Sequence, residues 1–574
     1  MSSRLPQSLL SATYPRLQRP PLSISILKLA RAMTVNSALP GPRVSDAAHP
    51  FDKPSADIIL RSSDLVDFRV YSQILIAASP FFEGLFQVPQ PLVEEQARNY
   101  YGLPIIEVSE DGETLDYLLR LCYPIKKPEG IALQVVESTL RAAMKYEMEL
   151  ADMLLTKNLI GDGVPRSPLE VWAIGCRLRR EDIASAGGRG LTWTYKTLRH
   201  TGSRSLLPDL ESTTNLEAVT AGQLFRICNY IDLCPSSETA SDFRFIDPSP
   251  TENVVGALEE DFRSTDSLHM FADISSADVS CRSSDGVVFH AHQAVLRAAS
   301  SVLRMKVAQR TTSDIDESRE PGDSAHTSNP ERSLPVLQFE ETSQVLPHLI
   351  AYCYPAHIPT PLPNLPQLLA VLSAVARHEI AIARRALLAQ WSEAASTNPL
   401  RAYFLAIQAG DADCAKAAAR HVLRGPVEGV YVQEMESSPA LAYLRLLLYY
   451  QSCKDMAERG ILGEASLGAP DGMGDLKKGS RKMVRHGAAQ PRVKSGDSDS
   501  EPWLQTYMKN LWMTLERHPH PSFLPTMEQL LIASTSGDNQ PWCDNCSSVA
   551  STLVVRSNDL RALRDAMEKV DLAI

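Results

Sequence analysis

The chain has 574 residues, a formal net charge of −11 and a sequence pI of about 5.7. Its length predicts about three or four domains. The acidic balance argues against nucleic acid as the main ligand, because neutralising phosphates requires concentrated Lys and Arg. No apolar run reaches the roughly 18 residues that a membrane-spanning helix needs, so no membrane association is expected. The ten cysteines do not indicate a disulfide scaffold in a chain this long, which predicts a reducing compartment, cytoplasmic and/or nuclear.

Residues 1–50 are expected to form a disordered N-terminal tail. Within them, residues 1–45 contain no Asp or Glu and are rich in Ser, Leu and Pro. This composition is also compatible with a mitochondrial transit peptide, although its prolines would break a long amphipathic helix. A third interpretation is an extension upstream of a true start at Met33. The sequence leaves these alternatives open; the basic residues concerned are Arg4, Arg16, Arg19, Lys28, Arg31 and Arg43.

An internal repeat dominates the rest of the chain. Ala56–Ser79 aligns without a gap with Ala277–Ser300, and half of the positions are identical. Identity over such a length indicates two copies of one structural unit. The shared positions are Ala56/Ala277, Asp57/Asp278, Arg61/Arg282, Ser62/Ser283, Ser63/Ser284, Asp64/Asp285, Val66/Val287, Phe68/Phe289, Leu75/Leu296, Ala77/Ala298, Ala78/Ala299 and Ser79/Ser300.

Each copy predicts a hairpin that leads into a helix. In the first copy, a short apolar strand starts at Asp57, Ser63-Asp64 signals a turn, and alternation around Phe68 indicates a second strand. A helix with one apolar face then ends at Ser79-Pro80. Phe68 and its counterpart Phe289 are therefore predicted to be core residues of equivalent strands.

At these residues the chain resembles the BTB/POZ domain family. The resemblance lies in the strand-opening Asp, the Phe-x-(Val/Ala)-His element, the Leu-x-x-x-Ser helix and the aromatic pair that follows. Two features depart from the pattern: Tyr71 replaces the His in the first copy, and the second copy lacks the aromatic pair. The matching residues are Phe68-Arg69-Val70, Ser79-Pro80-Phe81-Phe82 and Gly84-Leu85-Phe86 in the first copy, and Phe289-His290-Ala291-His292 and Leu296 in the second, where Ser301-Val302-Leu303-Arg304-Met305 stands in place of the aromatic pair.

The similarity continues downstream of the hairpins. Leu103–Pro124 pairs with Leu334–Pro355, each predicting a strand, an acidic turn and a helix that ends in Cys-Tyr-Pro. Farther on, Ser167-Pro168 and Asn398-Pro399 begin apolar helices at the same offset, with a capping residue followed by Pro at the first helical position. The repeated unit thus includes a short helical extension. The motifs of the first copy are most similar to those of BTB proteins of filamentous fungi.

The connecting segments are less regular. Residues 161–165 read as a linker, and the glycines of 187–190 read as a break before one plausible helix at Leu216–Ile231. Polar residues fill Arg310–Ser333, which is expected to be a disordered insert. A helix over 439–453 is expected to end at Cys453, and 464–502 to be disordered. A helix with an apolar stripe from Trp503 to Leu515 and a last helix carrying Leu560, Leu563, Met567 and Val570 complete the chain.

Enzyme motifs are absent, and no catalytic, cofactor-binding or metal residue is assigned. Cys543-Asp544-Asn545-Cys546 has metal-like spacing, but it supplies two of the four ligands that structural zinc needs. Cys453, His518 or His520 could complete a site; the alternative is two unligated cysteines. His292 in His290-Ala291-His292 is expected to have a structural role. Val93-Glu94-Glu95 resembles a short cullin-contact element, but three residues are a weak match and a solvated acidic loop is the favoured interpretation.

These observations predict a helix-rich α+β protein with two BTB/POZ-like units, each a small sheet capped by helices and followed by a helical extension. The resemblance implies a non-enzymatic interaction or scaffold protein; the alternatives are a substrate adaptor of a cullin-based ubiquitin ligase and a transcription regulator. The implied partners are proteins, through BTB self-association within or between chains. The expected boundaries are 1–50 tail, 51–160 first unit, 165–265 extension and spacer, 268–392 second unit, 397–460 extension, 464–502 linker and 503–574 C-terminal helical region.

Overall fold

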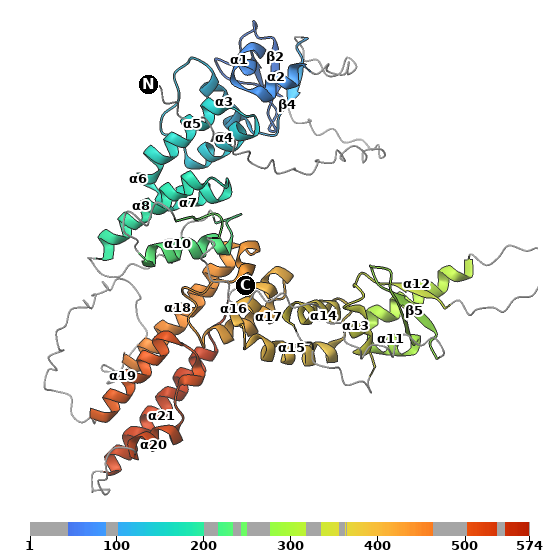
Figure 1. The fold of residues 1–574 in the computed structure, drawn as a ribbon, viewed down its shortest axis with the longest axis vertical. Coiled ribbons are helices and arrows are strands. Elements are labelled where there is room, and N and C mark those ends of the chain that lie inside the picture. Colours follow the sequence, from blue (N-terminus) through green and yellow to red (C-terminus); the bar gives the residue numbers. More distant parts are fainter. Residues whose placement is uncertain are drawn as a thin grey trace, which may run out of the picture. The chain divides into compact units, whose positions relative to one another are not determined.

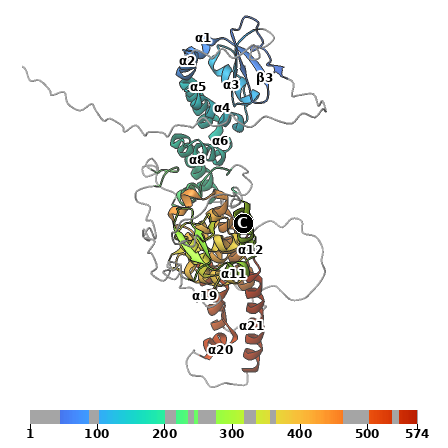
Figure 2. The ribbon, with the colours of Figure 1, turned by 90° about the vertical axis from the view of Figure 1, so that its right-hand side faces the viewer.

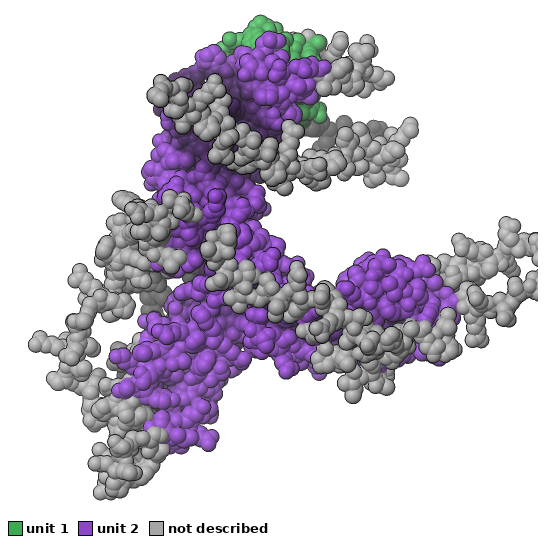
Figure 3. All heavy atoms as spheres, in the orientation of Figure 1, with its two compact units in different colours: residues 1–72, 91–112 green, residues 73–90, 113–574 purple. Residues whose placement is uncertain are grey.

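The computed structural model describes a helix-rich α+β protein, as the sequence predicts. It divides into two compact units: residues 1–72 and 91–112 contribute to the first, and residues 73–90 and 113–574 to the second (Figure 3). The predicted disordered segments fall largely outside the described residues, as do Val93-Glu94-Glu95 and Cys543. The described residues are 44–87, 102–199, 210, 216–233, 243–248, 276–316, 334–354, 362, 364–462, 502–535 and 546–572.

The first unit is built on a four-stranded mixed sheet, in the order β1-β3-β2-β4. β2 (Ile58–Arg61) and β3 (Val66–Val70) form the predicted antiparallel hairpin, and β4 (Ile105–Glu107) runs parallel to β2. A short strand that was not predicted, β1 (Ser45–Asp46), runs parallel to β3. Assigning all of 1–50 to a disordered tail was therefore wrong at its end, because residues 45–46 pair with the hairpin.

Between Leu133 and Arg199, the helices follow one another almost without interruption. The predicted linker at 161–165 is helical, since η2, a π-helical turn (Leu159–Gly163), continues into α6. The predicted break at 187–190 lies inside α8, so both expectations were wrong. The helices are α1 (Ser72–Ala78), α2 (Pro80–Gln87), α3 (Gly112–Cys122), α4 (Leu133–Lys145), α5 (Glu149–Asn158), α6 (Val164–Arg166), α7 (Pro168–Arg177) and α8 (Glu181–Arg199).

Close packing explains why α8 contains glycines. A Cβ atom on Gly187 would lie 2.4 Å from the backbone nitrogen of the buried Trp172 on α7, and one on Gly188 would lie 2.5 Å from the Phe245 ring. On α7, Gly175 would meet the nitrogen of Ala184 at 2.3 Å in the same way. Glycine is disfavoured inside helices, but here it permits two helix backbones to approach each other.

A second, three-stranded mixed sheet lies in the second unit, in the order β6-β5-β7. Its strands are β5 (Val279–Arg282), β6 (Val288–Ala291) and β7 (Val336–Gln338). The insert expected from Arg310 is helical at its start, because α12 continues to Asp316, and 317–333 lies outside the described residues. The helices of this region are α11 (Gln293–Ala299), α12 (Ser301–Asp316), α13 (Leu346–Ala351), α14 (Leu365–Arg377) and α15 (Ala381–Ala395).

The remaining helices extend the same hydrophobic core. α16 (Pro399–Ala409) and α17 (Ala412–Val422) pack together, and α18 (Ala440–Leu462) packs against α10 (Ala221–Leu233), α19 and α21 (Figure 1). α20 lies beside α21 (Figure 2). α18 passes the predicted end at Cys453, because Ala457 and Ile461 continue its buried face. The final elements are η4 (Gln433–Ser437), α19 (Pro502–Arg517), η5 (Pro521–Phe523), α20 (Met527–Thr535) and α21 (Cys546–Glu568).

α10 begins five residues later than predicted from Leu216. Thr220 forms an isolated β-bridge with Pro439, so its backbone cannot be helical there. Its hydroxyl accepts from the Gln223 amide, while the Gln223 side chain accepts from the Thr220 amide. This reciprocal cap fixes the start of the helix at Ala221. In the described part of the chain, no helix is long and apolar enough to cross a membrane.

Candidate functional site

The two sheets have the same strand register. Ile58 pairs with Val70 in the first, and Val279 with Ala291 in the second, at the positions that the sequence repeat equates. The parallel strand is also equivalent, since Leu60 faces Ile106 and Cys281 faces Leu337. The repeat therefore corresponds to a repeated local fold.

Shared polar side chains hold the same backbone groups in both copies. Asp57 accepts from the Ser72 amide at the start of α1, and Asp278 accepts from the Gln293 amide at the start of α11. Ser79 donates its hydroxyl proton to the carbonyl of Tyr146. The equivalent pair is Ser300 and His378. These short side chains satisfy helix-end groups that would otherwise lack partners, which is why they persist where the apolar side chains change.

The two predicted core phenylalanines differ in burial. Phe68 is 2% exposed and lies against Phe51, with ring centroids 5.8 Å apart. Phe289 occupies the equivalent place opposite Cys281 but is only partly buried, so its assignment as a core residue was wrong. Its strand, β6, has no partner beyond β5 among the described residues, whereas β3 lies between β1 and β2.

His292 has the structural role expected of it. It stands at the N-cap of α11, where its amide donates to the Tyr354 hydroxyl and its Nδ1 lies 2.8 Å from the same oxygen. Tyr71, which replaces it in the first copy, contacts the Ser55 hydroxyl instead at 2.6 Å. No cluster of three or more metal-ligating side chains occurs among the described residues.

Comparison with known families gives one match. Residues 51–162 match the family model of the BTB/POZ domain. The chain contains a BTB/POZ domain. No second match is found over 268–392, and no curated protein matches the chain. A BTB/POZ domain is a protein-interaction module that includes self-association among its contacts, and it is typically non-catalytic.

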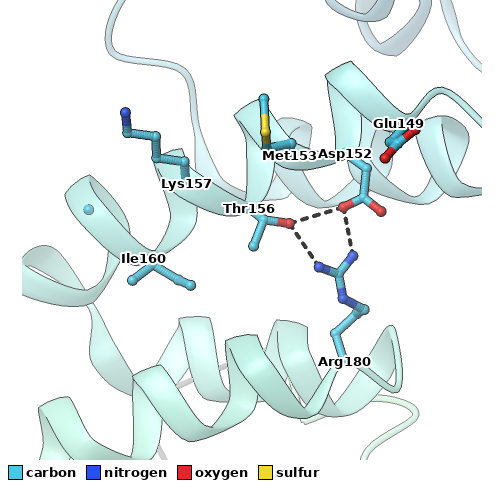
Figure 4. A pocket seen from close by; sticks show the side chains of 8 residues that line it. Glu149, Asp152, Met153, Thr156, Lys157, Ile160 and Arg180 are labelled. Atoms are coloured by element: carbon cyan, nitrogen blue, oxygen red, sulfur yellow. Dashed lines mark hydrogen bonds and ion pairs between the residues drawn. The ribbon is translucent and has the colours of Figure 1, made fainter. Parts of the chain in front are cut away.

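A groove lies at the end of the BTB/POZ domain. Its volume is about 560 Å³, and Figure 4 shows its lining side chains around α5 and the start of α8. Met153 is 59% exposed and Ile160 is 39% exposed, although both are apolar. The lining residues are Glu149, Asp152, Met153, Thr156, Lys157, Ile160, Gly161 and Arg180.

Arg180 forms one wall of the groove. Its guanidinium donates to Asp152 at 2.7 Å, to Thr156 at 3.1 Å and to Asp182 at 2.8 Å (Figure 4 shows the first two). These hydrogen bonds, led by that with Asp182, raise the pKa of Arg180 above its usual value. The charge of Arg180 is thus compensated by Asp152 and Asp182, which also hold its guanidinium in place. Glu149 and Lys157 at the rim have no ion-pair partner among the described residues.

A buried ion pair joins the BTB/POZ domain to the helical extension. Arg177 on α7 donates to both oxygens of Glu137 on α4, at 2.8 and 2.6 Å, and both side chains are under 10% exposed. The corresponding positions of the second copy are Leu369 and Gln408. Sequence inspection missed this pair, because the two residues lie on different predicted helices.

The cysteines give no sign of reactive chemistry in the described part of the chain. Seven are free, and burial raises the thiol pKa of Cys122 to about 11 and of Cys281 and Cys353 to about 12. Thiols with raised pKa values are poor nucleophiles at neutral pH. Cys546 begins α21, and its predicted zinc-binding partner Cys543 is outside the described residues, so that prediction stays open.

Proposed function

We propose that this chain is a non-enzymatic scaffold that holds protein partners through two BTB/POZ-like units. The observation that carries the proposal is the match of residues 51–162 to the BTB/POZ domain, whose known role is protein interaction. Fold alone is a weak guide to function, so the proposal also needs a surface that a partner could use.

The region 268–392, which contains the second sheet, is proposed to be a diverged BTB/POZ-like copy. Support comes from the strand registers and from the shared Asp and Ser contacts described above. A backbone conformation is also shared: Glu147 and Glu379 both adopt left-handed φ values, of 53° and 54°, after equivalent helices. Non-glycine residues rarely adopt this conformation, so its recurrence favours common ancestry of the two units.

The partner-binding surface is proposed to be the groove along α5. Its exposed apolar residues, Met153 on α5 and Ile160 on the π-helical turn that follows, both line the groove. Glu149 and Lys157 flank them with unpaired charges of opposite sign. These features are complementary to an amphipathic partner helix that carries a base and an acid beside its apolar face.

Affinity capture with mass spectrometry tests this surface. The full-length chain should lose a defined partner when Met153→Asp and Ile160→Asp are introduced, because a charge on the apolar floor cannot be desolvated favourably. Met513→Asp, a substitution at a 52% exposed methionine on α19, is the matched control. Unchanged capture by the groove variant would contradict the assignment of the groove.

The captured proteins also distinguish the alternatives. Cullin peptides would favour a ubiquitin-ligase adaptor, and chromatin proteins would favour a transcription regulator. Capture restricted to other proteins or to further copies of this chain would favour a scaffold.

The two BTB/POZ-like copies, at 51–160 and 268–392, are further proposed to pair with each other within one chain. A tether inside a chain gives an effective concentration that competes with micromolar partners in solution. Uneven divergence supports this, since Pro80-Phe81-Phe82 corresponds to Ser301-Val302-Leu303. Light scattering of the full chain should then give the monomer mass of 63.2 kDa at micromolar concentration. A dimer mass would favour pairing between chains.

A further inference from the structure

A second cavity lies far along the chain from the BTB/POZ domain, among α17, α18, η5 and α21. Its volume is about 650 Å³, which is within the range of about 300–1,000 Å³ that small-molecule sites occupy. The proposed interaction function does not use it. The lining residues are Arg420, Leu423, Tyr449, His520, Pro521, Ser522, Arg564, Met567 and Glu568.

The two arginines that line this cavity have no carboxylate within ion-pair distance among the described residues. The positive charge of Arg420 helps to lower the pKa of Asp571, but the Asp571 carboxylate forms its ion pair with Lys416, whose Nζ lies 2.9 Å from Oδ1. Arg564 donates to the carbonyl of Leu524, and its Nε has no hydrogen-bond partner. A neutral carbonyl leaves the guanidinium charge uncompensated, so the cavity has two cationic groups available to an anion.

His520 adds a neutral donor to this wall. The Ser522 amide donates to its Nδ1 at 3.0 Å, which places the ring proton of the neutral imidazole on Nε2. Burial, followed by the nearby positive charges of Arg424 and His421, lowers the pKa of His520 to about 4. The imidazole is therefore uncharged at neutral pH, mainly because it is buried, and the neighbouring Arg424 adds positive charge that attracts an anion.

The remaining lining residues define the other parts of a ligand. Leu423, Pro521 and Met567 provide apolar surface, and Glu568 is an acceptor without an ion-pair partner in the described structure. We propose that this cavity binds a small organic anion. Its phosphate or carboxylate group lies on Arg420 and Arg564, because guanidinium groups bind such oxyanions in a bidentate manner. Its apolar part contacts the aliphatic wall, and a hydroxyl or amine of the ligand donates to Glu568.

Calorimetric titration of the full chain with simple probes tests this assignment. Phenyl phosphate and benzoate combine an oxyanion with an apolar ring, inorganic phosphate lacks the ring, and benzyl alcohol lacks the charge. We expect phenyl phosphate or benzoate to bind, inorganic phosphate to bind more weakly, and benzyl alcohol not to bind. Tighter binding of phenyl phosphate identifies a phosphorylated ligand, and tighter binding of benzoate identifies a carboxylate.

Matched variants locate the binding. Arg420→Gln and Arg564→Gln should each weaken it by about tenfold or more, since each removes a charge-assisted contact. Arg561→Gln, on the same helix as Arg564 but outside the lining, should leave it unchanged. Arg420 is exposed, so its variant remains informative if Arg564→Gln fails to fold. Equal affinities in all variants, or no binding of either ring-bearing anion at millimolar concentration, would overturn the proposal.

Discussion

The BTB/POZ domain and the second sheet region share a backbone framework but differ in the side chains around it. Both hairpins have the same register, and Asp57/Asp278 and Ser79/Ser300 make the same contacts. The first sheet has an additional strand, β1, beside its hairpin, and the second does not within the described residues. Polar contacts to backbone groups depend on position alone, whereas apolar packing can be replaced by any side chains that fill the same volume.

The junctions, meaning the contacts between each sheet region and the helical extension that follows it, differ even more. Glu137 and Arg177 form a buried ion pair in the first half, while Leu369 is buried at the equivalent place in the second. A buried ion pair is often no more stable than well-packed apolar residues, but removing one partner leaves an uncompensated charge. The two halves therefore represent two solutions to the same packing problem, with different sensitivities to mutation.

Substitution of Glu137 should have the largest effect. Glu137→Ala removes the carboxylate that accepts both hydrogen bonds from the buried Arg177, and it should lower the free energy of unfolding by about 3–5 kcal/mol. The double variant Glu137→Leu/Arg177→Leu should recover most of this loss, because it replaces both buried charges with apolar side chains, as Leu369 replaces Glu137 in the second junction. Chemical denaturation measures both, with Arg141→Ala as the control at an exposed partner of Glu137. A double variant as unstable as the single one would disprove the proposed equivalence of the junctions.

The phenylalanine pair should show the difference in burial directly. Phe68→Ala should cost about 3–5 kcal/mol, because the ring is fully buried. Phe289→Ala should cost roughly 1–2 kcal/mol, because a half-buried ring loses less apolar contact. Hydrogen exchange with mass spectrometry, read on peptides of each hairpin, separates the two losses. Equal losses would mean that the second ring is as buried as the first.

Acid should destabilise the second region selectively through Glu341. This carboxylate is 4% exposed; His378 Nε2 lies 3.1 Å from it and Arg377 Nη2 lies 3.2 Å from it. Its pKa is lowered from 4.5 in spite of an opposing desolvation effect, mainly through the hydrogen bond from His378. A lowered folded-state pKa means that Glu341 stabilises the fold above about pH 4.5, and that this stabilisation is lost as the pH falls through the folded-state value.

The protection of the 336–378 peptides against amide hydrogen exchange should accordingly fall between pH 5 and pH 3. Glu341→Gln should remove that part of the pH dependence. Its first-copy equivalent, Glu110, is only half-buried and serves as the matched position. An unchanged pH profile in Glu341→Gln would contradict the assignment.

The smallest effect concerns the left-handed residues after α4 and α14. Glu147→Gly should stabilise the chain by about 1 kcal/mol, because glycine adopts a positive φ without steric cost. Glu379→Gly should gain less, since Glu379 also accepts a hydrogen bond from Ser301 at 2.8 Å. Thermal unfolding compares the two variants. A loss of stability in Glu147→Gly would show that the helix end does not carry this strain.

Several features followed from the sequence because they depend on local chemistry. Repeated residues at fixed spacing predicted both hairpins, the helices after them and the Pro-initiated helices α7 and α16, since turn and strand preferences act over a few residues. The structural role of His292 followed in the same way. Neither Ser167 nor Asn398 makes the side-chain capping hydrogen bond that its position suggests, so the helix starts were predicted correctly but not the contacts that fix them.

The tertiary structure decided the features that depend on distant neighbours. The glycines of 187–190 became a packing surface instead of a break, because Trp172 and Phe245 lie against them. Thr220 ends its strand-like pairing with Pro439 before α10 can begin, and β1 appears only because β3 offers an unpaired edge. The cationic cavity beside α21 is also assembled from residues far apart in sequence. Burial and proximity of this kind leave no periodic pattern in a single chain, so they emerge only when the segments are packed together.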